Sequence, residues 1–167
     1  MRDARRNPPA SILTTAIRML ARREHSRAEL EQRLLAHGGD AAEVARTLDE
    51  LERRGYVSDA RFAQMLVAQK AGRFGRRAIA HAIRERGVEA SAASAALETL
   101  AARDEAAEAR ALWNRRFGTA PADERARARQ VRFLIARGYG LSVALDVVGR
   151  SSHGARRDAG DEPERDC

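Results

Sequence analysis

The chain has 167 residues, enough for one medium-sized domain or a short array of small units. Aromatic residues make up only 4% and charged residues 33%, and the abundance of Ala, Leu, Arg and Glu favours helix. The single cysteine, Cys167, excludes an internal disulfide framework and a cluster of thiolate metal ligands. No apolar run reaches the roughly 18–20 residues that cross a bilayer, and the N-terminus lacks a cleavage-site pattern. We therefore expect a cytoplasmic protein that does not bind membranes.

The formal net charge of +7 indicates an acidic partner, such as nucleic acid or an acidic protein surface. Every basic residue except Lys70 is an arginine. Arginine binds carboxylate and phosphate through two parallel hydrogen bonds, so it suits either partner.

One pattern occurs three times along the chain, and Gly38, Gly87 and Gly138 align its copies. Large apolar residues recur 25 and 21 residues before each glycine, four residues before it and ten after it. Copy by copy, they are Leu13, Ile17, Leu34 and Leu48; Phe62, Leu66, Ile83 and Leu97; and Trp113, Phe117, Leu134 and Val148. Spacings of three or four residues predict helix faces, and a glycine after the second helix is typical of a helix C-terminus. Each copy therefore predicts helix, turn, helix, glycine turn, helix.

Residues that favour helix termini place the repeats along the chain. Ser26 with Glu29 predicts the start of the second helix of the first copy, and Asp40 the start of the third. Ser58 and Asp59 open the second copy. The joint at 103–105 has neither Gly nor Pro, so the helices on its two sides are expected to run together.

We predict an all-α fold in which three tandem three-helix repeats stack into an elongated, curved array, because one such unit buries too little surface alone. The expected bounds are a flexible N-terminus at 1–9, repeats at 10–57, 58–102 and 103–150, and a disordered C-terminal tail at 151–167.

The sequence gives no support for catalysis. The four histidines, His25, His37, His81 and His153, are scattered and show no metal-ligand spacing. Ser26 and His25 are adjacent and do not face each other, so Ser26 is better interpreted as a helix cap. We expect no catalytic residue, no metal and no cofactor.

Two groups of arginines are candidate contacts with an acidic partner. Arg73 lies in a Gly72–Gly75 segment of the form GxxG, and Arg76 and Arg77 begin the next helix. A helix N-terminus favours anions, and cations there are otherwise unfavourable. For the GxxG segment itself, a plain helix–helix connection is the favoured interpretation.

The second group shares one face of the middle helix of the third repeat, opposite Val131, Leu134 and Ile135. Its members are Arg125, Arg129 and Arg132. For both groups the alternative is a solvated helix face without a partner.

Aromatic residues count against a protein that binds single strands by stacking. Phe62, Trp113 and Phe117 fall on repeated core positions, which leaves Tyr56, Phe74 and Tyr139 outside the expected core. Three scattered rings are too few for a base-stacking platform.

Four segments in order resemble the RecX regulatory proteins. They are residues 22–30 (RREHSRAEL), 55–63 (GYVSDARFA), 73–88 (with RFGRR and RGV) and 133–139 (FLIARGY). The resemblance covers roughly residues 12–149 and implies a RecA modulator that binds in the groove of the RecA–DNA filament and inhibits its ATPase and strand exchange.

We therefore expect a monomeric partner of the RecA filament with weak, non-specific DNA contact. Two alternatives stay open at this point: an autonomous basic DNA-binding protein, since helix triplets resemble helix-turn-helix units, and a helical adaptor for another acidic protein.

Overall fold

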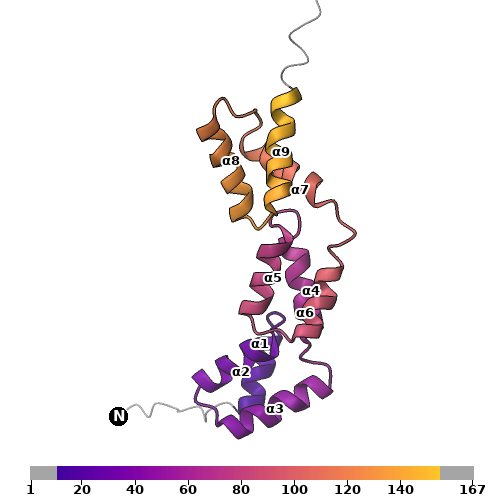
Figure 1. Cartoon of the computed structure of the whole chain (residues 1–167). Helices are drawn as coiled ribbons and strands as arrows, with labels where there is room; N and C mark the ends of the chain where they lie inside the picture. The colour runs from indigo at the N-terminus through magenta and orange to yellow at the C-terminus, as the bar shows by residue number, and fades with distance from the viewer. Residues whose placement is uncertain (1–10, 155–167) are drawn as a thin grey trace, which may run out of the picture. The chain divides into compact units, whose positions relative to one another are not determined.

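The computed structural model describes residues 11–154, which form nine α-helices and contain no strand (Figure 1). The prediction of an all-α protein built from three-helix repeats is confirmed. The helices are α1 (Ile12–Leu20), α2 (Arg27–Ala36), α3 (Ala41–Arg53), α4 (Asp59–Lys70), α5 (Arg76–Glu85), α6 (Ala90–Glu98), α7 (Glu105–Arg116), α8 (Glu124–Ala136) and α9 (Leu141–Gly154).

Helix α9 continues past residue 150, where the sequence predicts the third repeat to end. The predicted flexible N-terminus at 1–9 lies outside the described residues, and so do residues 155–167 of the predicted disordered tail.

The described residues divide into two compact units, and the division falls inside the second repeat. The first unit runs to Val67 and includes Ala82–Ala96, and the second holds Ala68–His81 and everything from Leu97 onward. Each unit thus combines one complete outer repeat with part of the middle one.

The core of the first unit is aliphatic. Leu30, Leu34, Val44 and Leu48 are fully buried, and α1, α2 and α3 pack on one another around them. The prediction that Leu13 and Ile17 face this core is wrong.

Leu13 and Ile17 are 45% and 48% exposed. Helix α1 instead packs through Ile12 and Met19, on either side of the fully buried Ala16. This apolar stripe has the same helical period but starts one residue earlier, and the small Ala16 side chain allows close packing.

The core of the second unit contains the larger side chains. Trp113 is 3% exposed and donates a hydrogen bond from Nε1 to Oε1 of the buried Gln130 at 2.9 Å. Phe117 meets Phe133 edge to face, with ring centroids 5.3 Å apart. The predicted core positions Trp113 and Leu134 are confirmed.

Tyr139, expected outside the core, is completely buried in the second unit. Burial, with the charges of Glu108 and Glu105 adding to it, raises the pKa of its hydroxyl group. Tyr139 directly follows the glycine turn at Gly138, and the sequence pattern does not show that its side chain points into the core.

The three aligned glycines take the backbone conformation that the repeat pattern requires. Gly38, Gly87 and Gly138 have φ values of +87°, +62° and +86°, the left-handed region that favours glycine at a helix C-terminus.

Side-chain caps fix the helix starts. The Ser26 hydroxyl accepts a hydrogen bond from the Glu29 N–H, and the Asp40 carboxylate accepts from Ala42 and Glu43. The expectation that helices run together through 103–105 is wrong, because α6 ends at Glu98 and Asp104 caps α7 by accepting from the Ala107 N–H. A single aspartate cap can start a helix without Gly or Pro.

Candidate partner-binding site

The start of α5 carries the first predicted group of arginines. Arg76 and Arg77 are the first two residues of the helix, and Arg73 lies in the loop that precedes it. All three are exposed and belong to the second unit.

The backbone N–H groups at this helix start are already used within the protein. Gly75 N–H donates to the carbonyl of Arg137 at 2.9 Å, and Arg77 N–H donates to that of Gly138 at 3.3 Å. Arg76 N–H donates to Oε1 of Glu105 at 3.3 Å. An external anion would therefore meet the arginine side chains here, since no N–H of these three residues is left for it.

The Gly72–Gly75 segment connects α4 to α5, in agreement with the interpretation favoured from the sequence. Gly72 N–H donates to Oε2 of Glu108 at 3.1 Å. A Cβ on Gly75 would lie 2.5 Å from the Gly138 carbonyl oxygen. Glycine at position 75 thus allows two backbone segments to pass in close contact.

The three arginine side chains differ in availability. Arg76 donates from Nη1 to the carbonyl oxygen of Leu97 at 2.6 Å and so ties α5 to the end of α6. Arg73 and Arg77 make no side-chain hydrogen bond or ion pair with any described residue. Arg73 and Arg77 are therefore the members of this group that a partner can engage at least cost.

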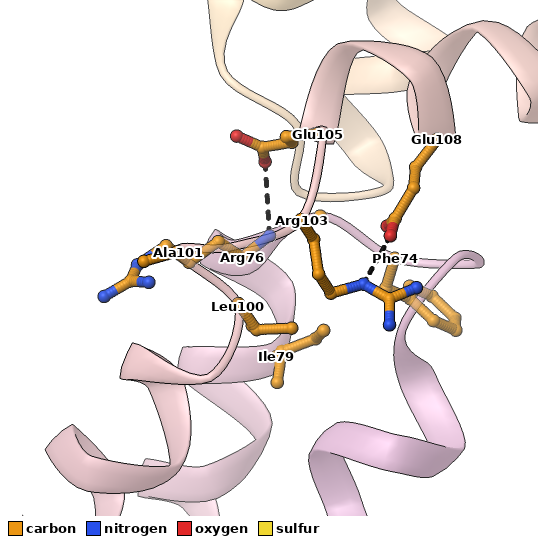
Figure 2. Close-up of a pocket in the computed structure, with 9 residues that line it drawn as sticks. Phe74, Arg76, Ile79, Leu100, Ala101, Arg103, Glu105 and Glu108 are labelled. Carbon is orange, nitrogen blue, oxygen red and sulfur yellow. Dashed lines mark hydrogen bonds and ion pairs between the residues drawn. The ribbon is translucent and has the colours of Figure 1, made fainter.

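A pocket of about 180 Å³ opens beside Arg76 (Figure 2). Its apolar lining comes from Phe74, Ile79, Leu100 and Ala101. The charged residues around it are Arg76, Arg103, Glu105 and Glu108. Sequence reasoning missed all of these except Phe74 and Arg76. Ile79 lies on α5 itself, and the others become its neighbours only when the α6–α7 connection and the start of α7 fold against α5.

The Phe74 ring contacts two cations. Lys70 Nζ lies 4.8 Å and the Arg137 guanidinium 5.4 Å from the ring centroid. Phe74 is half-buried. The expectation that Phe74 lies outside the core is thus only partly met. Cation–π contacts with Lys70 and Arg137 account for the position of its ring.

The second predicted group lies on α8. Arg125, Arg129 and Arg132 are exposed and make no side-chain hydrogen bond or ion pair within the described residues. On the opposite face Val131 and Leu134 are buried, but Ile135 is 41% exposed. Both predicted groups thus belong to the second unit.

In the first unit, a cluster of charged groups surrounds Glu29. Its carboxylate pairs with Arg23 at 3.1 Å and with Arg86 at 2.8 Å, and His25 Nδ1 lies 3.4 Å from it. Burial alone would raise the pKa of Glu29, but the hydrogen bond and charge of Arg23, with the charge of Arg86, outweigh it and lower the pKa.

His25 is 3% exposed. Burial, helped by the charge of Arg23, lowers its pKa below 6.5 and favours the neutral ring. The adjacent Ser26 hydroxyl donates to the Arg86 carbonyl at 2.5 Å. His25 and Ser26 thus have structural roles.

In residues 11–154, no three His, Cys, Asp or Glu side chains come together in a way that could hold a metal ion. Over the same residues, no helix combines the length and the apolar character needed to cross a membrane.

Comparison with known proteins identifies the class. The chain matches the first three-helix domain of RecX over residues 13–51, the second over 58–97 and the third over 103–148. It is 42% identical over 150 residues to the regulatory protein RecX of Leptothrix cholodnii, covering 90% of this chain and 95% of the relative. It is 39% identical over 155 residues to the regulatory protein RecX of Ralstonia nicotianae, covering 93% and 96%.

Solved structures agree on the fold. The crystal structure of RecX from Lactobacillus salivarius superposes with a TM-score of 0.71 at 14% sequence identity, over 87% of this chain and 97% of that one. A second crystal structure of a regulatory protein RecX gives a TM-score of 0.73 at 18% identity, over 85% and 73%.

These features define a helical-repeat protein of the regulatory class, whose relatives are named for regulation and not for a reaction. The chain belongs to the RecX family.

Proposed function

We propose that this protein binds the RecA–DNA filament in the cytoplasm and lowers the ATPase and recombinase activity of RecA during DNA repair. The observation that carries the proposal is family membership, since RecX relatives match over nine-tenths of the chain. The protein acts as a monomer and by binding alone.

The charges support an acidic partner surface. The chain has a net charge of +7, and Arg73 and Arg77 are exposed without a described partner. Guanidinium groups of this kind pair with carboxylates of a protein or with phosphates of DNA. Arg125, Arg129 and Arg132 supply a second contact of the same chemistry.

The first prediction concerns the two available arginines at the start of α5. In the Arg73→Ala/Arg77→Ala variant, we expect the concentration that half-inhibits the RecA ATPase on single-stranded DNA to rise about five- to thirtyfold. That range corresponds to two contacts of roughly 0.5–1 kcal/mol each. The helical circular-dichroism signal is expected to stay unchanged, because both side chains are exposed and neither makes a hydrogen bond or ion pair with a described residue.

The matched control is Arg46→Ala/Arg84→Ala, which removes the same charge from two exposed arginines of the first unit. We expect this control to stay within about threefold of the wild-type chain, because only non-specific charge is lost. Equal weakening by both pairs would mean that net charge and not this site governs binding.

A DNA-binding protein without RecA is the rival function, and it predicts tight, sequence-specific binding to bare duplex. The proposed function instead predicts weak duplex binding that does not depend on sequence and falls steeply with salt.

A further inference from the structure

We propose that the pocket beside the start of α5 receives one apolar side chain from an acidic segment of the protein partner. This inference rests on the proposed function and names a contact that the partner makes.

The size of the pocket selects the kind of occupant. At about 180 Å³ it is smaller than the roughly 300–1,000 Å³ of sites that hold drug-sized ligands or cofactors. A nucleotide would not fit, whereas a single large side chain would.

The floor of the pocket is apolar. Ile79 is 1% exposed, and Leu100 and Ala101 come from the connection between α6 and α7. Figure 2 shows Ile79 and Leu100 facing one another, with Arg103 extending towards Phe74 and Glu108. An apolar side chain that enters here would leave water for contact with these residues, a typical basis for a binding hot spot.

The charged groups around the floor determine what flanks that side chain. Glu105 accepts from the Arg76 N–H, and Glu108 accepts from the Gly72 N–H and pairs with Arg103. Each carboxylate thus has a hydrogen-bond donor within the protein, and Glu108 also pairs with a cation. Arg76 lines the pocket, and its neighbours in the sequence at this helix start, Arg73 and Arg77, keep their guanidiniums for a partner. Carboxylates beside the entering side chain would be attracted to these cations.

The second prediction concerns a substitution that fills the pocket from its exposed edge. Ala101 lines the pocket and is exposed, so its side chain can be enlarged with little effect on the core. We expect Ala101→Phe to raise the half-inhibiting concentration in the RecA ATPase assay at least tenfold. The matched control is Ala102→Phe, at an exposed neighbour that does not line the pocket, and we expect it to stay within twofold of wild type.

A second route avoids any effect on folding. In a Cys167→Ser background, Ala101→Cys is purified folded and then alkylated with N-benzylmaleimide or with the smaller N-methylmaleimide. We expect only the benzyl adduct to lose inhibition.

The outcomes separate the two proposals. A wild-type chain that leaves the ATPase unchanged would overturn the proposed function and this inference with it. A wild-type chain that inhibits, together with equal potency of the Ala101→Phe and Ala102→Phe variants and of the two adducts, would overturn the pocket inference alone.

Discussion

His25 and Glu29 lie side by side, yet the neutral form is favoured for His25 and the charged form for Glu29. The His25 pKa is lowered by burial and by Arg23, so the ring is neutral at pH 7. Glu29 is held as a carboxylate by Arg23 and Arg86. The first unit therefore contains a polar cluster whose stability depends on pH.

The third prediction follows from His25. The pKa of His25 is lower in the folded protein than its value of 6.5 in the unfolded chain. The contribution of His25 to stability is therefore complete above pH 6.5, and it is lost as the pH falls from 6.5 towards the lower pKa of the folded protein, because the unfolded chain binds the proton more readily. We expect the free energy of unfolding in urea to be lower at pH 5.5 than at pH 7.5, and the drop to be smaller in His25→Gln. Glu29 remains ionised over this range, because its pKa lies below 4.5. An identical drop in both proteins would show that His25 does not set the pH dependence.

Two of the glycine turns do more than end a helix. A Cβ on Gly87 would lie 2.6 Å from the Cβ of Ala28, near the start of α2. A Cβ on Gly138 would overlap the backbone of Ala78, near the start of α5. The missing side chain at each glycine therefore allows the second helix of the preceding repeat to pack closely against the glycine turn. This close contact occurs once in each unit.

The backbone at these two junctions follows one scheme. Arg27 N–H donates to Asp59 at 2.8 Å in the first unit, and Arg76 N–H donates to Glu105 in the second. In both places a carboxylate from the first helix of the next repeat caps the second helix of the preceding one. The junction thus repeats along with the helices.

The fourth prediction compares equivalent glycines. Apart from the glycine and its chain neighbours, no described residue places an atom within 4 Å of a Cβ on Gly38, although its φ is as positive as that of Gly138. Gly38→Ala should cost about 1–2 kcal/mol of stability from backbone conformation alone. Gly138→Ala should cost about 1–3 kcal/mol more, because the methyl group meets the Ala78 backbone. Urea unfolding followed by circular dichroism measures both, and equal costs would contradict the junction.

Sequence periodicity predicts the helices well because helix faces and glycine turns are local properties. It fails at α1, where two apolar stripes one residue apart compete and packing against the small Ala16 decides. It also fails at Tyr139, whose burial depends on tertiary contacts.

The candidate site shows the same limit. Sequence patterns place Arg73, Arg76 and Arg77 at a helix start, but the engagement of Arg76 by the Leu97 carbonyl depends on the packing of α6. The pocket is likewise invisible in sequence, because Leu100 and Arg103 follow no repeated position.

Over the whole molecule, some arginines pair with carboxylates of the protein and others keep their guanidiniums for a partner. In the first unit Arg23, Arg27 and Arg86 are held by carboxylates of that unit. The six arginines predicted as partner contacts all belong to the second unit, and only Arg76 among them uses its side chain within the described structure. The remaining five, Arg73, Arg77, Arg125, Arg129 and Arg132, are therefore the predicted contacts that we expect the partner to engage.

The fifth prediction addresses the central claim, that this chain regulates RecA by binding its filament. The most direct measurement is the ATPase rate of RecA on single-stranded DNA while the wild-type protein is titrated from nanomolar to micromolar concentration. The rate should fall to a low plateau. An unchanged rate at micromolar protein would contradict the claim.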